Sequence, residues 1–327
     1  MCEMLVQQRR RPQLARTGKV TDMQLKKDVW RCAIVGASAA DIVAAGSLEG
    51  WPLTWVPALG SLRYLADPFG LWRHDRLHVF AEWFDYRDAT GRIAVSIYDA
   101  NLCLIDQRVV LREPWHLSYP FVFEAEGETW LMPESFQSGA LTLYRAVSFP
   151  HRWEAAIRIE LDTVPLDATP LHHDGLWWIF YAPAYPVTAR LTHLCAAYAD
   201  RLGGPWHAYS GNPVLVDPLG ARPGGAPVRH GGVIHIPLQG CAGTYGAELR
   251  LLRIDTLHPD RIAVAPAGVL HAPSGAAPFI DGCHTLAAAG HVTLIDVKRT
   301  RLSAVGLAVR PLRPLYRAAR AAEPYRW

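Results

Sequence analysis

Short apolar runs alternate with turn-forming residues along most of this chain, beginning at Trp30. Strands with one buried face alternate apolar and polar residues in this way, and Gly, Pro, Asp and Asn mark the turns. One run, Ala37–Ala45, has the spacing of a helix, and it is short. Residues 1–28 are polar and have no apolar period. The pattern predicts an all-β domain over residues 29–320 and a disordered basic tail over residues 1–28.

An internal repeat organises the predicted strands. Five segments share a short strand, a tight turn rich in Asp and Gly, and an apolar strand. Such turns need positive φ, so an Asp-Gly-like pair between apolar runs predicts a hairpin. The repeat length is roughly 45 to 60 residues, which is typical of one four-stranded propeller blade. The turns lie near Asp75, Gly127, Gly175, Gly231 and Gly290.

Further alternating segments lie between these hairpins, so that each repeat offers about four strands. Five such units predict a single five-bladed β-propeller with four-stranded blades. A two-sheet sandwich is the alternative all-β architecture, but it does not predict one hairpin signature in every repeat.

Composition narrows the class of protein. The 12 Trp, 25 Pro and 26 Gly suit strands and tight turns, and a net charge of +3 gives no sign of a nucleic-acid partner. The six cysteines contain no Cys-x-x-Cys pair, which argues against a zinc site and a dense disulfide framework. No run approaches the roughly 18 apolar residues of a membrane span, and no signal-peptide core precedes Val29. We expect a cytoplasmic protein without a metal or cofactor.

Polar residues stand where the innermost strands of the blades should begin. When the repeats are aligned on their turns, the innermost strands have equivalent starting residues in Asp67, Tyr119, Asp167, Gly224 and His284. On the returning strands of the first three repeats, the equivalent residues are Glu82, Glu134 and Tyr181. Polar groups at the ends of apolar strands need partners or solvent, so this register predicts a polar pocket at the axis. Each residue alone also fits a structural role, since Asp before Pro is common in turns.

Paired carboxyl groups are what glycoside chemistry requires. One acid protonates the leaving oxygen, and one carboxylate activates water or attacks the sugar. A third carboxylate can shift the pKa of the acid. Asp67, Glu134 and Asp167 are therefore the predicted catalytic residues. His116, His284 and these carboxylates could instead hold a cation in the channel.

Several of these segments together resemble the N-terminal propeller domain of the plant glucosamine inositolphosphorylceramide transferases. The resemblance covers about residues 50–297, and nothing in the chain matches the glycosyltransferase domain that follows in the plant proteins. Bacterial relatives carry the domain alone or fused to formyltransferases. The motifs are "RYLADPFG", "HLSYPFVFEAEGETWLMPES", "LDATPLHHDGLWWIF", "YADRLGGPW", "ARPGG", "YGAEL" and "HTL". The substrate contacts expected in them and at the axis are Glu82, His116, Tyr119, Tyr181, Arg222, Gln239, Tyr245 and His284.

The segments are also similar, more distantly, to the five-bladed propellers of glycoside hydrolase family 43. That resemblance implies that Asp67, in a "DP" motif, is the general base, that Asp167 modulates a pKa and that Glu134 is the acid. One departure stands in the fourth repeat, where relatives carry Gln-Asp and this chain has Gln239 followed by Gly240. A carboxylate that contacts substrate in the relatives is then absent here.

Three functions remain open at this point. The first is a hydrolase or transglycosylase that acts on a small-molecule sugar or glycoconjugate through axial carboxylates. The second is a non-catalytic module that binds a glycan or nucleotide sugar for a biosynthetic partner enzyme. The third is a scaffold for protein partners, against which the repeated carboxylates argue. Three acids exceed what binding a neutral sugar needs, which favours the enzyme, although fold alone does not decide function.

Overall fold

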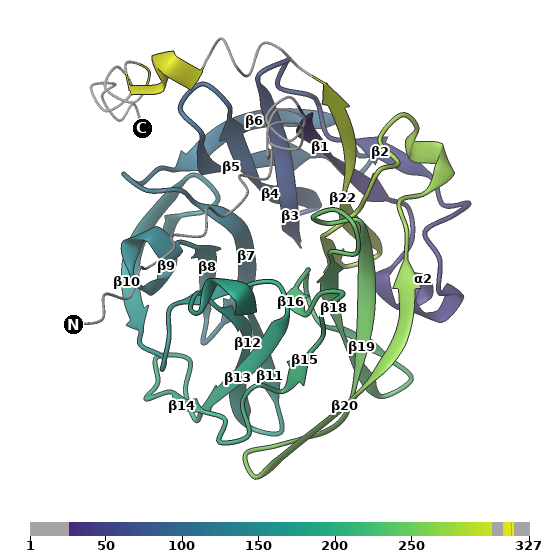
Figure 1. Cartoon of the computed structure of the whole chain (residues 1–327). Helices are drawn as coiled ribbons and strands as arrows, with labels where there is room; N and C mark the ends of the chain where they lie inside the picture. Colours follow the sequence, from purple (N-terminus) through teal and green to yellow (C-terminus); the bar gives the residue numbers. More distant parts are fainter. Residues whose placement is uncertain (1–25, 303–309, 315, 317–327) are drawn as a thin grey trace, which may run out of the picture.

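The computed structural model describes residues 26–302, 310–314 and 316. These residues form five antiparallel sheets arranged around a central axis (Figure 1). The predicted all-β, five-bladed β-propeller is therefore confirmed. No helix in the described part of the chain has the length and apolar character needed to cross a bilayer.

The first three blades follow the chain in order, with the earliest strand of each blade innermost. Sequential antiparallel pairing of this kind needs only short hairpin loops. In the third blade, β15 also pairs with β13. The strands are β3 (Arg63–Arg73), β4 (Arg76–Asp85), β5 (Thr90–Tyr98), β6 (Leu104–Leu111), β7 (Ser118–Ala125), β8 (Glu128–Glu134), β9 (Leu141–Ser148), β10 (Arg152–Ile159), β11 (Pro165–His173), β12 (Leu176–Pro183), β13 (His193–Ala199), β14 (His207–Ala208) and β15 (Leu215–Val216).

The fourth and fifth blades differ from this simple order. In the fourth, two short segments, β16 and β17, both pair with β18. In the fifth, the order β21–β22–β1–β2 combines both ends of the described chain. The strands are β16 (Arg222–Pro223), β17 (Val228–His230), β18 (Val233–Gly240), β19 (Glu248–His258), β20 (Arg261–Leu270), β21 (Leu286–Ala289), β22 (Val292–Leu302), β1 (Lys26–Val35) and β2 (Leu53–Trp55).

The pairing of β1 with β22 closes the ring, because it joins the N-terminal strand to the last blade. It runs from Lys26 opposite Leu302 to Val35 opposite Thr293. Strand β1 thus begins within the segment predicted to be disordered, and that boundary is wrong by three residues. The rest of the predicted tail, residues 1–25, and the predicted domain end at residue 320 lie outside the described residues.

All five predicted hairpin turns join the two innermost strands of a blade. Their residues take left-handed φ angles, which Gly and Asp tolerate best. The φ values are 57° at Asp75, 78° at Gly127, 79° at Gly175, 57° at Gly231 and 61° at Gly290.

Among the described residues, helical structure lies in the loops between strands and in the segment that follows β22. The predicted helix is α2 (Ala39–Ala45), which the Ser38 side chain caps by accepting a hydrogen bond from the Asp41 amide. Gly46 ends it with a φ of 62°. The 3-10 turns are η1 (Phe136–Ser138), η2 (Val187–Ala189), η3 (Ser274–Ala276) and η4 (Arg310–Leu312).

Candidate active site

Three of the innermost strands begin with the same backbone distortion. Asp67, Tyr119 and Asp167 have φ angles of 50°, 46° and 48°. Each lies where the pairing register with the next strand shifts, as at a β-bulge. A bulge redirects a side chain, and left-handed backbone at a non-glycine residue costs on the order of 1–3 kcal/mol. The predicted equivalence of these three positions is confirmed.

On the second strand of each of these blades, one residue pairs with the residue just before Asp67, Tyr119 or Asp167. Glu82 and Glu134 occupy this position in the first two blades, as predicted. In the third blade the equivalent residue is Ala182, so the prediction for Tyr181 is wrong. A shift of one residue turns a side chain to the other face of the sheet. Tyr181 is buried there, and its hydroxyl donates to Asp162 Oδ1 at 2.6 Å.

Gln239 and Lys298 hold the same register in the fourth and fifth blades. The Lys298 side chain is fully buried, and Nζ donates to Thr244 Oγ1 at 3.1 Å and to the carbonyl oxygen of Tyr245. Burial lowers the pKa of this amine. Sequence reasoning missed Lys298, although Lys298 lies as far from the start of β22 as Glu82 lies from the start of β4.

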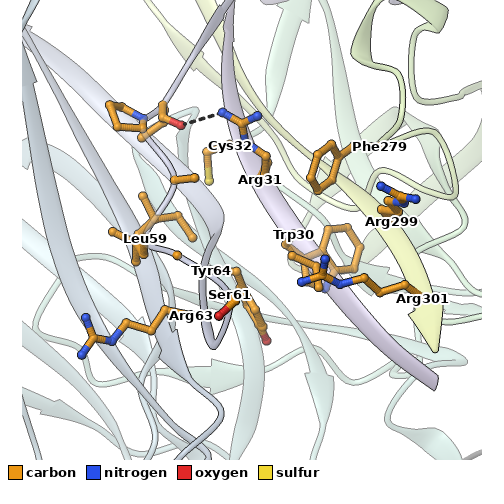
Figure 2. A pocket seen from close by; sticks show the side chains of 16 residues that line it. Trp30, Arg31, Cys32, Leu59, Ser61, Arg63, Tyr64, Phe279, Arg299 and Arg301 are labelled. Carbon is orange, nitrogen blue, oxygen red and sulfur yellow. Dashed lines mark hydrogen bonds between the residues drawn. The ribbon is translucent and has the colours of Figure 1, made fainter. Parts of the chain in front are cut away.

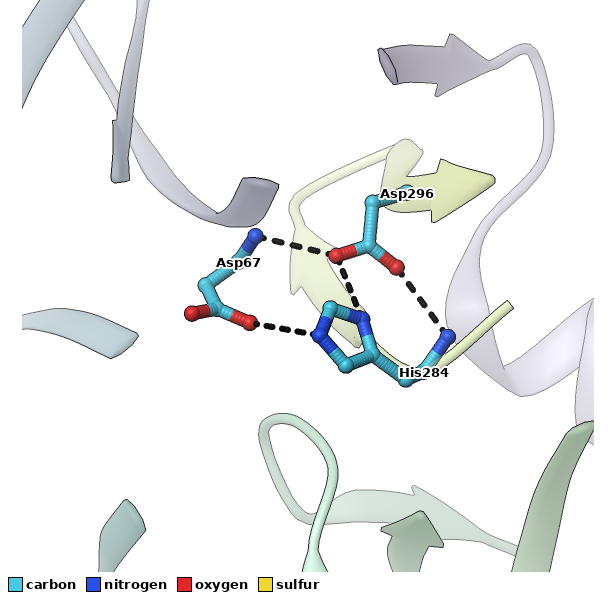
Figure 3. A group of neighbouring side chains, drawn as sticks. All are labelled: Asp67, His284 and Asp296. Atoms are coloured by element: carbon cyan, nitrogen blue, oxygen red, sulfur yellow. Dashed lines mark hydrogen bonds and ion pairs between the residues drawn. The ribbon is translucent and has the colours of Figure 1, made fainter. Parts of the chain in front are cut away.

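Asp67, His284 and Asp296 form a chain of contacts at the axis (Figure 3). His284 Nε2 lies 3.4 Å from Asp67 Oδ1, and Nδ1 lies 2.7 Å from Asp296 Oδ2. Thr285 Oγ1 and the Tyr119 amide each donate to the Asp67 carboxylate at 3.1 Å. Asp296 accepts from the amides of His284 and Thr285 at 3.1 and 3.0 Å. Asp296 was also missed, although a lone acid in the apolar run "VTLIDVK" was its signal.

The electrostatics of this chain of contacts raise the pKa values of both Asp67 and His284. Burial raises the pKa of Asp67 from 3.8 to about 6, although His284 opposes the shift. Burial acts to lower the pKa of His284, but Asp296 and Asp67 outweigh it and the pKa rises above 6.5. The Asp67 carboxyl therefore changes its protonation state near pH 6, and the raised pKa of His284 favours the imidazolium form.

Aromatic rings cover His284. The Trp30 ring stacks on it with centroids 3.8 Å apart and planes 16° apart. The Tyr245 ring meets His284 edge-on at 5.4 Å. Tyr245 is 37% exposed whereas His284 is 3% exposed, so Tyr245 forms the part of this group that solvent reaches.

Asp167 is held by two partners from the fourth blade. Arg222 donates from Nε and Nη2 to the two carboxylate oxygens at 2.5 and 2.7 Å. Gln239 Nε2 donates to Asp167 Oδ2 at 2.6 Å. A bidentate Arg–carboxylate pair fixes both groups in one orientation. Asp167, Arg222 and Gln239 are all predicted site residues, and they lie in direct contact. Both oxygens of the Asp167 carboxylate accept hydrogen bonds from Arg222.

Glu134 has the environment of a buried acid. Its Oε1 accepts from the Phe136 amide at 2.7 Å, and its Oε2 accepts from Ser118 Oγ at 3.1 Å. Burial raises the pKa of Glu134 to about 7, while the nearby Arg222 opposes that shift. Near neutral pH this carboxyl therefore exists in both protonation states, as a general acid requires.

Glu82 and His116 form a second pair beside these acids. His116 Nδ1 accepts from the Gly91 amide at 2.9 Å, so the proton of the neutral ring is on Nε2. Nε2 lies 3.4 Å from Glu82 Oε1. Burial raises the pKa of Glu82 well above 4.5 and lowers that of His116 to about 4. Both shifts favour the uncharged forms of the two groups.

Tyr119 connects blades and is not placed to contact a substrate. It is fully buried, and its hydroxyl lies 2.8 Å from Thr169 Oγ1. The same hydroxyl accepts from the Gly225 amide at 2.7 Å. Tyr119 therefore links the second, third and fourth blades, which corrects its predicted role as a substrate contact.

In the fourth blade, Gly240 stands where the relatives were expected to carry a carboxylate. The space beside Gly240 is filled by a residue of the neighbouring strand β19. A Cβ at Gly240 would lie 2.4 Å from Glu248 Cγ and 3.1 Å from its Oε1. Gly240 and Glu248 are direct cross-strand partners. The space of a side chain at position 240 is thus filled by a different acidic residue.

Among the described residues, one group of acids and histidines has the spacing of a metal site. The ligand atoms of Asp67, His284 and Asp296 lie within 4.8 Å of one another. Because the pKa of His284 is raised, its imidazolium can supply positive charge between the two carboxylates. The donors would fit a small cation only if His284 were neutral.

Solved structures define the class of fold to which this arrangement belongs. The chain is similar to RS223-β-xylosidase, with a TM-score of 0.51 and 14% identity over 66% of this chain and 80% of that one. It is similar to Zg3597, a family 117 glycoside hydrolase of Zobellia galactanivorans, with a TM-score of 0.50 and 13% identity over 64% and 70% of the chains. At such identities the likeness concerns the fold, which is the five-bladed propeller of these glycoside hydrolases.

The family follows from the sequence itself. Residues 57–269 match the family "Glucosamine inositolphosphorylceramide transferase 1, N-terminal", and the chain belongs to this family. The glucosamine inositolphosphorylceramide transferase 1 of Oryza sativa subsp. indica is 32% identical over 236 residues, or 68% of this chain and 32% of the relative. That of Arabidopsis thaliana is 33% identical over 198 residues, or 59% and 26%. The chain thus spans about a third of the length of the rice relative.

Proposed function

We propose that the axial cluster carries out glycosidase-type acid/base chemistry on a sugar or glycoconjugate. The observation that carries this proposal is a pair of buried carboxyl groups with different environments, Glu134 with a pKa of about 7 and Asp67 with a pKa of about 6. In the proposal Glu134 is the acid because burial favours its protonated form, and Asp67 is the base because His284 lies beside it.

In this reaction Glu134 gives its proton to the glycosidic oxygen as the bond between that oxygen and the anomeric carbon breaks. Asp67 takes a proton from the attacking water, whose oxygen forms the new bond to the anomeric carbon. A sugar hydroxyl in place of water gives transfer instead of hydrolysis. His284 stabilises the ionised form of Asp67, since its Nε2 lies 3.4 Å away.

In the proposal, Asp167 and its ion-pair partner Arg222 influence the pKa of Glu134 and do not react with the sugar. Its carboxylate is occupied by Arg222 and Gln239, which argues against a role as nucleophile. Arg222 lowers the pKa of Glu134 and Asp167 raises it, so the pair sets the acidity of the proton donor.

A binding module without turnover is the second candidate. It is favoured by the low exposure of the acids, which is 6% for Asp67, 5% for Glu134 and 2% for Asp167. Such a module would present a glycan or nucleotide sugar to a biosynthetic partner enzyme. Tyr245 and the partly exposed His116 would then be the first residues to meet the ligand.

A thermal-shift screen with product detection separates the two candidates. Wild type and Asp67→Asn are tested against monosaccharides, aryl glycosides and nucleotide sugars. The enzyme predicts a sugar that stabilises both proteins and is converted by wild type alone. Stabilisation of both without product from either would establish the module, and a panel without any stabilising sugar would contradict both.

A further inference from the structure

A cavity of about 240 Å³ lies between the fifth and first blades, outside the cluster of acids (Figure 2). Its walls come from β1, β3, the end of β22 and the loop around Leu59. None of the predicted catalytic residues lines it. Trp30 is shared, because it faces the cavity and also stacks on His284. The remaining apolar wall includes Tyr64 and Phe279.

Positive charge gathers around this cavity. Four arginines line it: Arg31, Arg63, Arg299 and Arg301. Arg63 pairs with Asp85 at 2.9 Å, but within the described ranges the other three have no carboxylate within ion-pair distance. Figure 2 shows Arg301 extending toward Trp30 at the centre of the view, whereas Arg63 points away from it.

Arg31 shows that this charge is partly desolvated and unpaired. Its Nε is buried without a hydrogen-bond partner. Nη2 makes a long contact of 3.5 Å with the Val56 carbonyl, and the guanidinium lies 4.3 Å from the centre of the Trp55 ring. Burial lowers the pKa of Arg31. A buried cation without a counter-charge is costly, and an anionic ligand would relieve that cost.

We propose that this cavity binds a small phosphate ester whose organic part is a nucleoside or a single sugar. The planar fork of a guanidinium matches phosphate oxygens, and Arg31, Arg299 and Arg301 can approach one phosphate from the β1–β22 side. Trp30, Tyr64 and Phe279 offer ring faces for the organic part. The volume lies just below the range of roughly 300–1,000 Å³ usual for ligand pockets, which favours a small ligand. The site is independent of the proposed acid/base reaction.

Isothermal titration calorimetry on the full chain tests this site with uridine monophosphate and glucose 1-phosphate. Uridine, glucose and inorganic phosphate are the matched probes that lack one part of the ligand. We expect at least one ester to bind at least about tenfold more tightly than its unphosphorylated counterpart and than inorganic phosphate. Arg301→Gln and Arg299→Gln should each weaken that binding by about tenfold or more, whereas Arg261→Gln, on exposed β20, should not.

Ser61→Trp is a second variant, because Ser61 is an exposed residue on the cavity wall where a large ring would fill the space. It should abolish binding while the unfolding midpoint stays within a few degrees of wild type. Failure of both esters to bind would overturn the proposal, as would equal binding of uridine or of glucose. Loss of binding in Asp67→Asn with retention in Arg301→Gln would place the ester at the axis and would also overturn it.

Discussion

At the scale of single residues, the axial site is defined by burial acting on ionisable groups. Asp67, Glu82 and Glu134 are each about 5% exposed, and burial is the largest cause of the raised pKa of each. Two ion pairs lie beside these carboxyl groups, Asp167 with Arg222 and His284 with Asp296. The site therefore holds both protonated and ionised carboxyl groups near neutral pH.

The raised pKa of Asp67 predicts how stability depends on pH. The folded chain binds this proton more tightly than the unfolded chain, so the free energy of unfolding should fall as pH rises from about 4 to about 6. Asp67→Asn should flatten the curve in this window by about 1–3 kcal/mol. Urea unfolding at stepped pH measures it, with Asp260→Asn on an exposed turn as the control. A wild-type curve that rises through this window would contradict the assignment.

At the scale of elements, the innermost hairpins are the units that carry the site. Each combines a turn of left-handed residues at one end with an axial residue at the other. The five turns were predictable because turn chemistry is local. The bulges at Asp67, Tyr119 and Asp167 were not predictable from local turn chemistry. Tyr181 was predicted at a position that Ala182 holds, one residue further along the strand, so its side chain lies on the other face of the sheet. The contact of Asp167 with Arg222 joins different blades, so no local pattern contains it.

Tyr119 gives a prediction about how the hairpins are tied together. Tyr119→Phe leaves the Gly225 amide without its acceptor in a buried position. We expect a loss of about 1–3 kcal/mol in the free energy of unfolding, since an unpaired buried donor loses its hydration without compensation. Urea denaturation measures this, and Tyr185→Phe, at a residue 63% exposed, is the matched control. Equal stability of the two variants would show that the link between blades contributes nothing.

At the scale of the whole molecule, the ring is closed by strands from distant parts of the chain. β22 lies beside β1, and β1 carries buried residues such as Ala33 and Ile34. The repeat predicted five blades, but it could not show that the fifth is completed by the N-terminal strands, because sequence proximity does not define that pairing. Closure also positions Trp30 against His284, so the fold and the site depend on the same strand.

Closure predicts that β1 contributes as much to stability as a strand within a blade. Ile34 is 1% exposed and belongs to the hydrophobic core. Ile34→Ala should lower the free energy of unfolding by about 2–5 kcal/mol, because it leaves a cavity in a close-packed region. Chemical denaturation followed by Trp fluorescence measures this. Val147→Ala, at a residue 45% exposed, should cost much less, and comparable losses would contradict the role of β1.

The most direct test of the central claim is the rate of product formation from the sugar found by screening, measured near pH 6.5 for wild type, Asp67→Asn and Glu134→Gln. Acid/base chemistry at the axis predicts that each variant loses about 100-fold or more in kcat while still binding the sugar. Asp260→Asn and Glu154→Gln, at exposed carboxyls, should keep the wild-type rate. Turnover that is unchanged in Asp67→Asn and Glu134→Gln would contradict the account.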